Sequence, residues 1–156
     1  MRALTLILML VALCVPQAQA ICVLCSCEVS AAPLTFGAFE PLDSAPLDGA
    51  GAIEVSCSGI AALSAIDVGI GGGINGTVAQ RKLKSGANLL NYNLYTNAGR
   101  TQIWGDGTGG YPDRTINNTL SLLTWNSSTP VYGRIAAAPA APVGAYSDTV
   151  TISVEW

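Results

Sequence analysis

The last residues of the chain alternate strictly between apolar and polar side chains, and this pattern constrains the fold more than any other feature. The apolar positions are Val150, Ile152, Val154 and Trp156. Side chains two residues apart lie on one face of a β-strand, so these four predict a strand with a single buried face. The alternation runs to Trp156, and no further strand follows it in the sequence. We therefore expect the open edge of this strand to receive a strand from another chain.

Residues 1–20 have the layout of a secretory signal peptide. A short basic start precedes an apolar run from Ala3 to Val15, and Ala18-Gln19-Ala20 matches a cleavage site. The run is short for a membrane span. Bulky Leu13 stands before Cys14 where lipoprotein sites have a small residue, which disfavours a lipid anchor. We expect an exported mature chain of residues 21–156, folded as one domain and with no membrane span.

Charge and residue types exclude several classes of function. After residues 1–20, six basic and ten acidic residues remain, a net charge of −4, and the chain has no histidine. Without a basic patch, nucleic acid is a poor partner. Without histidine, a Ser-His-Asp or Cys-His catalytic arrangement is impossible. Acidic pairs such as Asp106 and Asp113 lie in Gly- and Pro-rich stretches, where Asp is a common turn former. We expect no catalytic residue, no metal site and no cofactor.

Short alternating runs separated by Gly, Pro, Asn and Asp predict an all-β sandwich. We expect strands at 22–29 and 34–39 (one strand broken near Pro33), 52–57, 65–70, 89–96, 102–104, 120–125, 131–135 and 146–156. Three aromatic residues, Tyr92, Trp104 and Trp125, stand among apolar strand positions and are expected in the core. Tyr95 and Tyr111 lie near turns and are the better surface candidates.

Four cysteines remain after the signal peptide, namely Cys22, Cys25, Cys27 and Cys57. They could form a zinc site, a redox motif or disulfides, and export to an oxidising compartment favours disulfides. Four cysteines allow three pairings. We favour Cys27 with Cys57, which would tie the first strand to the second. Cys22 and Cys25 would then pair with each other or remain available for an intermolecular bond.

Several segments carry a family resemblance as an ordered set. They are Cys27-Glu28-Val29-Ser30-Ala31, Pro33-Leu34-Thr35-Phe36-Gly37-Ala38-Phe39, Ile53-Glu54-Val55-Ser56-Cys57-Ser58-Gly59, Leu90-Asn91-Tyr92-Asn93-Leu94-Tyr95, Trp104-Gly105-Asp106-Gly107-Thr108-Gly109-Gly110, Val131-Tyr132-Gly133-Arg134-Ile135 and Gly144-Ala145-Tyr146-Ser147-Asp148-Thr149-Val150. In this order they cover nearly the whole mature chain, which resembles the spore coat protein U domain family. That family includes subunits of archaic chaperone–usher pili.

The resemblance implies an incomplete immunoglobulin-like β-sandwich that lacks its last strand. In such pilins a periplasmic chaperone lends a strand, and at the outer-membrane usher the N-terminal extension of the next subunit replaces it. By resemblance, Val150, Ile152, Val154 and Trp156 would line the acceptor groove, and the carboxylate of Trp156 resembles the end that chaperones anchor. The resemblance also implies the Cys27–Cys57 disulfide. It implies a pilus subunit exported through the periplasm to the cell surface, contributing to adhesion or biofilm.

One feature departs from the pattern of a shaft pilin, because only residues 21–26 precede Cys27 after cleavage. Either this subunit accepts a strand without donating one, or Ile21 to Val29 acts as the donor. A minor or tip position is therefore as compatible with the sequence as a shaft position. The alternative to a pilin is a self-contained secreted glycan-binding or coat protein that uses Tyr95 and Tyr111. It predicts a closed sandwich with an internal last strand.

Overall fold

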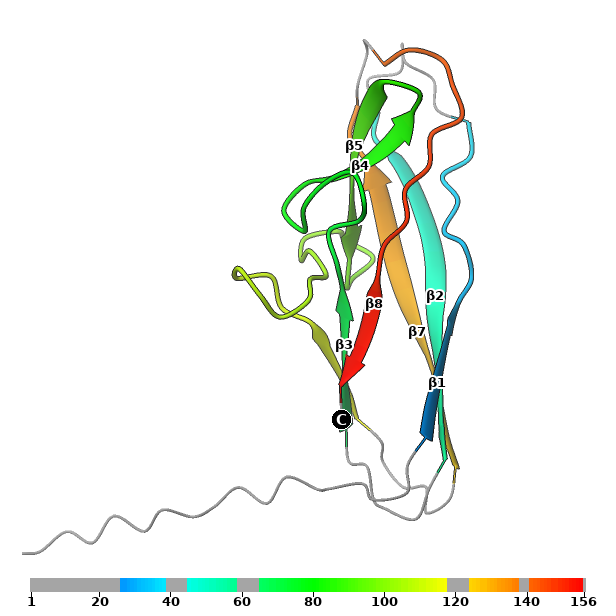
Figure 1. Cartoon of the computed structure of the whole chain (residues 1–156), viewed down its shortest axis with the longest axis vertical. Helices are drawn as coiled ribbons and strands as arrows, with labels where there is room; N and C mark the ends of the chain where they lie inside the picture. Colours follow the sequence, from blue (N-terminus) through cyan, green and yellow to red (C-terminus); the bar gives the residue numbers. More distant parts are fainter. Residues whose placement is uncertain (1–25, 39–44, 59–64, 118–123, 138–140, 156) are drawn as a thin grey trace, which may run out of the picture.

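Eight antiparallel strands form two facing sheets in the computed structural model, which describes residues 26–38, 45–58, 65–117, 124–137 and 141–155. The strands are β1 (Ser26–Ala31), β2 (Leu47–Ser58), β3 (Ala65–Ile70), β4 (Arg81–Ser85), β5 (Asn88–Tyr95), β6 (Arg114–Asn117), β7 (Thr124–Ile135) and β8 (Ile152–Glu155). The large sheet has the order β1-β2-β7-β5-β4 and the small sheet β6-β3-β8 (Figure 1). The described residues include no helix, so none is long and apolar enough to cross a membrane. This is the all-β sandwich that the sequence predicts, with the immunoglobulin-like fold that the family resemblance implies.

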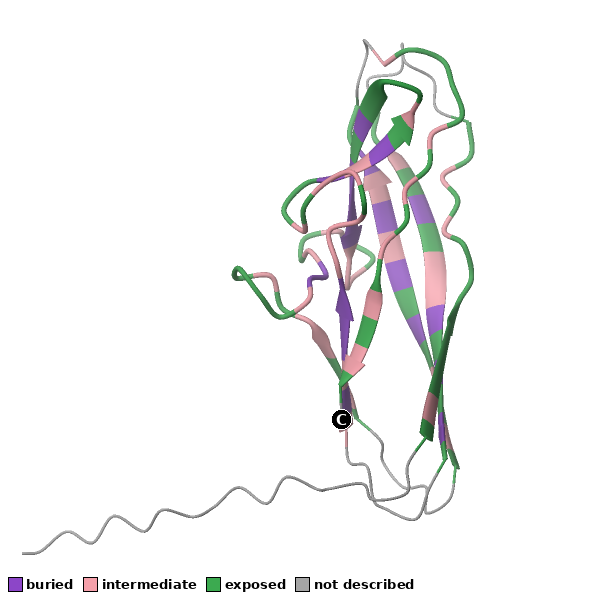
Figure 2. Cartoon of the chain, in the orientation of Figure 1, coloured by how far each residue is buried: buried purple, intermediate pink, exposed green. Residues whose placement is uncertain are grey.

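The core forms where the apolar sides of the alternating strands meet. Ile53, Val55 and Cys57 of β2 are buried, while the residues between them are exposed. Figure 2 shows the resulting bands of buried and exposed residues along β2 and β7. Trp104 is fully buried, and its indole Nε1 donates a 2.7 Å hydrogen bond to the carbonyl of Val68. These inward positions confirm the alternation expected for 52–57 and the core position of Trp104.

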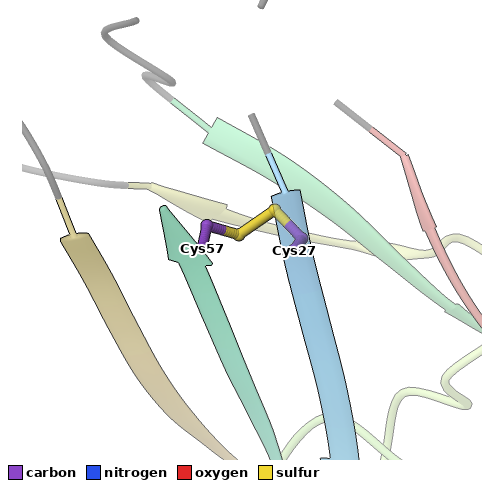
Figure 3. The surroundings of a disulfide bond; sticks show 2 residues. All are labelled: Cys27 and Cys57. Carbon is purple, nitrogen blue, oxygen red and sulfur yellow. A yellow bond between two sulfur atoms is a disulfide. The ribbon is translucent and has the colours of Figure 1, made fainter. Parts of the chain in front are cut away.

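A disulfide between Cys27 and Cys57 joins β1 to β2 (Figure 3). The two residues are direct cross-strand partners, and their Cα atoms lie 4.0 Å apart. The predicted pairing is confirmed. Cys22 and Cys25 lie outside the described residues, so the predicted alternatives for that pair stay predictions.

The last strand is shorter than expected. The alternation predicts a strand over 146–156, whereas β8 spans Ile152–Glu155. The neighbouring strand β3 ends at Ile70, and a run of three glycines follows it. The residues before Ile152 therefore have no regular strand of the small sheet beside them. The preceding residues instead make separate backbone hydrogen bonds, from Gly71 N–H to Thr151 O and from Ile74 N–H to Thr149 O.

Other expected strands also differ from those observed. The segment expected at 34–39 contributes a single bridge, between Thr35 and Ala50, and 102–104 contributes only a bridge between Ile103 and Tyr95. The strands expected at 120–125 and 131–135 are joined, because β7 is continuous over Thr124–Ile135 and includes Pro130. β5 pairs only with 132–135 of β7, so at Pro130 no described strand requires a ladder hydrogen bond on that side. The part of 120–125 before Thr124 lies outside the described residues.

Candidate functional site

An apolar groove opens between the two sheets, with a volume of about 1070 Å³. One wall is the segment from Ala31 to Ala38, and the other is the segment from Pro142 to Ile152. The floor is the inward face of the large sheet, including Leu90 and Ile135. In Figure 1 the segment after β1 runs along the right side of the molecule, and the segment before β8 descends from the top across β2 and β7 to β8. The groove therefore lies where a strand between β8 and β1 would complete the sandwich.

The backbone of β8 is unpaired on its groove side. β8 pairs with β3 alone among the described strands. Opposite β8, Ile70 turns its N–H away to the carbonyl of Gly105, whereas Gly71 donates to Thr151 O. Bonded and non-bonded pairs alternate in an antiparallel ladder, so the Ile70–Ile152 pair is non-bonded. The backbone N–H and C=O of Ile152, and by the same alternation those of Val150 and Val154, therefore face the open side.

β1 presents a second open edge to the same opening. Its cross-strand pair Val29–Val55 lies on the inward face, yet Val55 is 1% exposed and Val29 is 37% exposed. The short Cα separation of the Cys27–Cys57 pair is typical of a non-hydrogen-bonded pair, so every second backbone group of β1 points away from β2. The exposure of Val29 follows because no described strand covers it on the small-sheet side.

Phe36 holds the first wall against the large sheet. Its ring packs edge-on against that of Tyr92, with 6.0 Å between centroids. A Cβ at Gly133 would lie 2.7 Å from the Phe36 ring, so only glycine at this strand position allows the approach. The groove thus has a second wall, the segment Ala31–Ala38, which the apolar–polar alternation of the sequence does not predict. The signal that could have found it is a glycine inside an otherwise apolar strand.

A small polar cluster lies within the β8-side wall. The Asp148 carboxylate accepts hydrogen bonds from the Tyr92 hydroxyl (2.9 Å), the Asn75 side-chain amide (3.0 Å) and the Ile74 backbone N–H (3.2 Å). Burial and the hydrogen bond to Asp148 raise the pKa of Tyr92 well above its usual range. Tyr92 therefore acts as a hydrogen-bond donor at the groove floor.

Arg81 fixes the two sheets relative to each other beside this cluster. The side chain is fully buried. Its guanidinium donates to the carbonyls of Ile70 (2.6 Å), Gly71 (2.8 Å) and Trp104 (2.8 Å), and to the side-chain oxygen of Asn93 (2.6 Å). Burial lowers the pKa of Arg81, against the raising effect of Tyr92 and nearby carboxylates. A strand of the large sheet is thereby tied to the end of β3, which carries β8.

The predicted site residues fall in three groups. Val150 and Ile152 line the groove, half-buried, and alternate with exposed Thr149, Thr151 and Ser153. Val154 packs against the core but does not line the cavity. Trp156 lies outside the described residues.

Three charged side chains outside the groove, Asp48, Arg100 and Arg134, pair with one another. On the exposed face of the large sheet, Arg134 binds Asp48 through two hydrogen bonds of 2.7 and 2.9 Å, and Arg100 lies 3.1 Å from the same carboxylate. The hydrogen bond from Arg134 is the main cause that lowers the pKa of Asp48. At the glycine-rich turn, Asp106 accepts from the backbone and hydroxyl of Thr108. No group of three or more potential metal ligands occurs among the described residues.

A family model of the Spore Coat Protein U domain matches residues 13–153. The chain belongs to this family. The match spans both walls of the groove and the disulfide, so the Spore Coat Protein U domain is the unit that carries them. No curated protein matches the sequence.

Comparison with solved structures supports the same fold. One match is a chain in the crystal structure of the CsuC–CsuE chaperone–tip adhesion subunit pre-assembly complex, from archaic chaperone–usher Csu pili of Acinetobacter baumannii. The TM-score is 0.59 and the sequence identity 24%, over 85% of this Spore Coat Protein U chain. The chain spans 40% of the length of the matched one, and at this identity the likeness is one of fold.

Proposed function

We propose that this protein is a structural subunit of a surface fibre assembled by a chaperone and an usher, and that its groove accepts a donated strand. The observation that carries the proposal is the apolar groove bounded by the unpaired backbone edges of β8 and β1. In this role Val150, Ile152 and Val154 contact the inserted strand. Trp156 continues their alternation beyond the described residues. The domain provides a binding surface for a protein strand and catalyses no reaction.

The energetics of insertion favour such a partner. A donated strand gains backbone hydrogen bonds along β8 and buries every second side chain in the groove. Each large apolar side chain contributes roughly 1.5–3 kcal/mol when fully buried. This gain is offset by the cost of ordering the donor and by lost translational freedom. Several alternate apolar positions are therefore needed, which matches the length of the cavity wall from Pro142 to Ile152.

The proposed partners act in sequence. A periplasmic chaperone lends the first strand, and at the outer-membrane usher a neighbouring subunit replaces it. The printed description of the similar structure, a chaperone–tip adhesion subunit complex, supports a chaperone as the first partner. The assembled fibre lies at the cell surface and contributes to adhesion or biofilm. Of the candidate donor segment Ile21–Val29, the described part, Ser26–Val29, is already paired with β2 in its own domain.

The alternative of a self-contained glycan-binding module predicts an internal last strand. β8 instead lies at the edge of its sheet in the described structure. Tyr95 and Tyr111, the residues suggested for sugar contact, are both half-buried and lie on different segments. No described geometry favours that function over strand acceptance.

Co-expression with the cognate periplasmic chaperone tests the proposal. Ile152→Asp places a charge in the groove and should abolish co-purification with the chaperone. Thr151→Asp is the matched control, because its exposed side chain points away from the groove and should leave co-purification intact. A wild-type chain that is a stable monomer and captures no chaperone would contradict the proposal. Equal behaviour of the two variants would also contradict it.

A further inference from the structure

We propose that Asp148 sets the register of the inserted strand by accepting a hydrogen bond from one of its side chains. The inference rests on the proposed strand acceptance and adds the chemistry of the partner. The occupant is an extended segment with apolar side chains at successive alternate positions and a hydrogen-bond donor, such as Asn, at the next alternate position. No other inward position on the β8-side wall between Asp148 and Val154 bears a polar group.

The inward-facing positions of the β8-side wall change from apolar to acidic at Asp148. Val154, Ile152 and Val150 occupy successive inward positions, and Asp148 occupies the next one. Its side chain reaches across to the Tyr92 hydroxyl on the inward face of the large sheet, and both residues line the groove. A strand lying along this wall therefore meets apolar side chains and then one carboxylate.

The carboxylate has one acceptor site left in the described structure. Oδ1 accepts from Ile74 N–H and from the Asn75 amide, which uses both of its lone pairs. Oδ2 accepts only from the Tyr92 hydroxyl, so one lone pair remains. Hydrogen bonds to charged acceptors are stronger than those between neutral groups. A donor side chain beside Asp148 would fill the remaining site.

The surroundings fix the position of this carboxylate. A Cβ at Gly73 would overlap Oδ2 and lie 2.9 Å from the Asp148 carboxyl carbon. Gly73 also has φ +80°, a conformation that disfavours other residues. The loop is thus shaped around the carboxylate, and Asp148 cannot turn away when a strand enters without giving up its three hydrogen bonds.

The consequence is a penalty for wrong register. A shift by one residue turns the apolar side chains of the donor out of the groove. A shift by two keeps them inside but places an apolar side chain against the Asp148 carboxylate, which then loses water without gaining a partner. The apolar positions alone cannot distinguish shifts by two, so Asp148 provides the distinction.

A positional scan on the full chain tests the inference. The probes are labelled synthetic strands that alternate Val with Thr, in which one inward Val at a time is replaced by Asn, and dissociation constants come from fluorescence anisotropy. We expect one Asn position to bind about tenfold more tightly than the all-Val strand, the scale of one hydrogen bond to a charged acceptor. This preference should disappear in Asp148→Val and persist in Thr151→Val, a control whose exposed side chain does not line the groove.

Tyr92→Phe provides a second variant should Asp148→Val fail to fold. It frees another lone pair on Oδ2, so the preferred Asn position should be unchanged and the preference retained. If every Asn weakens binding relative to the all-Val strand, the register role is overturned while strand acceptance stands. The same holds if the preferred position survives in Asp148→Val. If no strand binds at all, both the register role and the proposed function are overturned.

Discussion

Tyr92 connects the core to the groove through a single hydroxyl. Its ring contacts Phe36 of one wall, and its hydroxyl donates to Asp148 of the other. Burial is the first cause that raises the pKa of Tyr92, and the hydrogen bond to Asp148 is the second. Arg81 of β4 nearby donates to the carbonyls of Ile70, at the end of β3, and of Trp104. Two buried polar side chains thus hold the groove walls at a fixed separation.

The raised pKa of Tyr92 predicts an alkaline limit to stability. Because the folded pKa lies above the unfolded value of about 10, the stabilisation is complete below pH 10 and is lost as the pH rises beyond it. Ultraviolet titration of the donor-bound chain should show one tyrosine still protonated where a free phenol has ionised. That tyrosine should be missing from Tyr92→Phe. The assignment would be refuted if the late-titrating tyrosine were still present in Tyr92→Phe.

At the scale of elements, regular alternation was sufficient to predict β3, β5 and the 52–57 part of β2, but not residues 47–51. Ile66, Val68 and Ile70, for example, mark one face of β3 without ambiguity. β4 could not be predicted, because Leu83 is the only apolar residue in Arg81–Ser85. Arg81 is also buried, but a charged residue gives no sequence signal of an inward position. Its strand character comes from pairing with β5 across a two-residue turn. β6, with Ile116 alone, depends on β3 in the same way.

The candidate site was half predictable for a related reason. The alternation of Val150 and Ile152 predicts the β8-side wall. The wall at Ala31–Ala38 is irregular and contacts the sheet through Leu34 and Phe36. Side chains on an irregular segment follow no fixed period, so only the packing of the folded chain shows that they face the groove. Asp148 lies inside the strand expected at 146–156 without a predicted role, and in the structure it is a groove residue.

The disulfide should matter most for β1, which pairs only with β2 among the described strands. Its cysteines are 30 residues apart. On the chain-entropy model, replacing both Cys27 and Cys57 by Ser lowers the free energy of unfolding by about 3–4 kcal/mol. Urea unfolding of the donor-bound chain measures this loss. Hydrogen exchange should rise first in β1, and an increase confined to β4 would contradict this account.

At the scale of the whole molecule, two sheets leave one shared opening. β1 at the edge of the large sheet and β8 at the edge of the small sheet both turn unpaired backbone toward it. Arg81 and the Asp148 cluster brace the β8-side wall, and the disulfide ties β1 to β2. The fold therefore holds open a groove of strand dimensions, which explains why the core is well buried at Val55 and incomplete at Val29.

The most direct test of this account is residue-resolved hydrogen exchange at the amides of Val150, Ile152 and Val154. The chain is compared alone and in complex with its co-expressed chaperone. We predict fast exchange of these three amides in the isolated chain and strong protection in the complex, with Ser153, whose backbone faces Gly69 of β3, changing less. Protection of Val150, Ile152 and Val154 in the isolated monomer would contradict the account, because the groove edge of β8 would then already be paired.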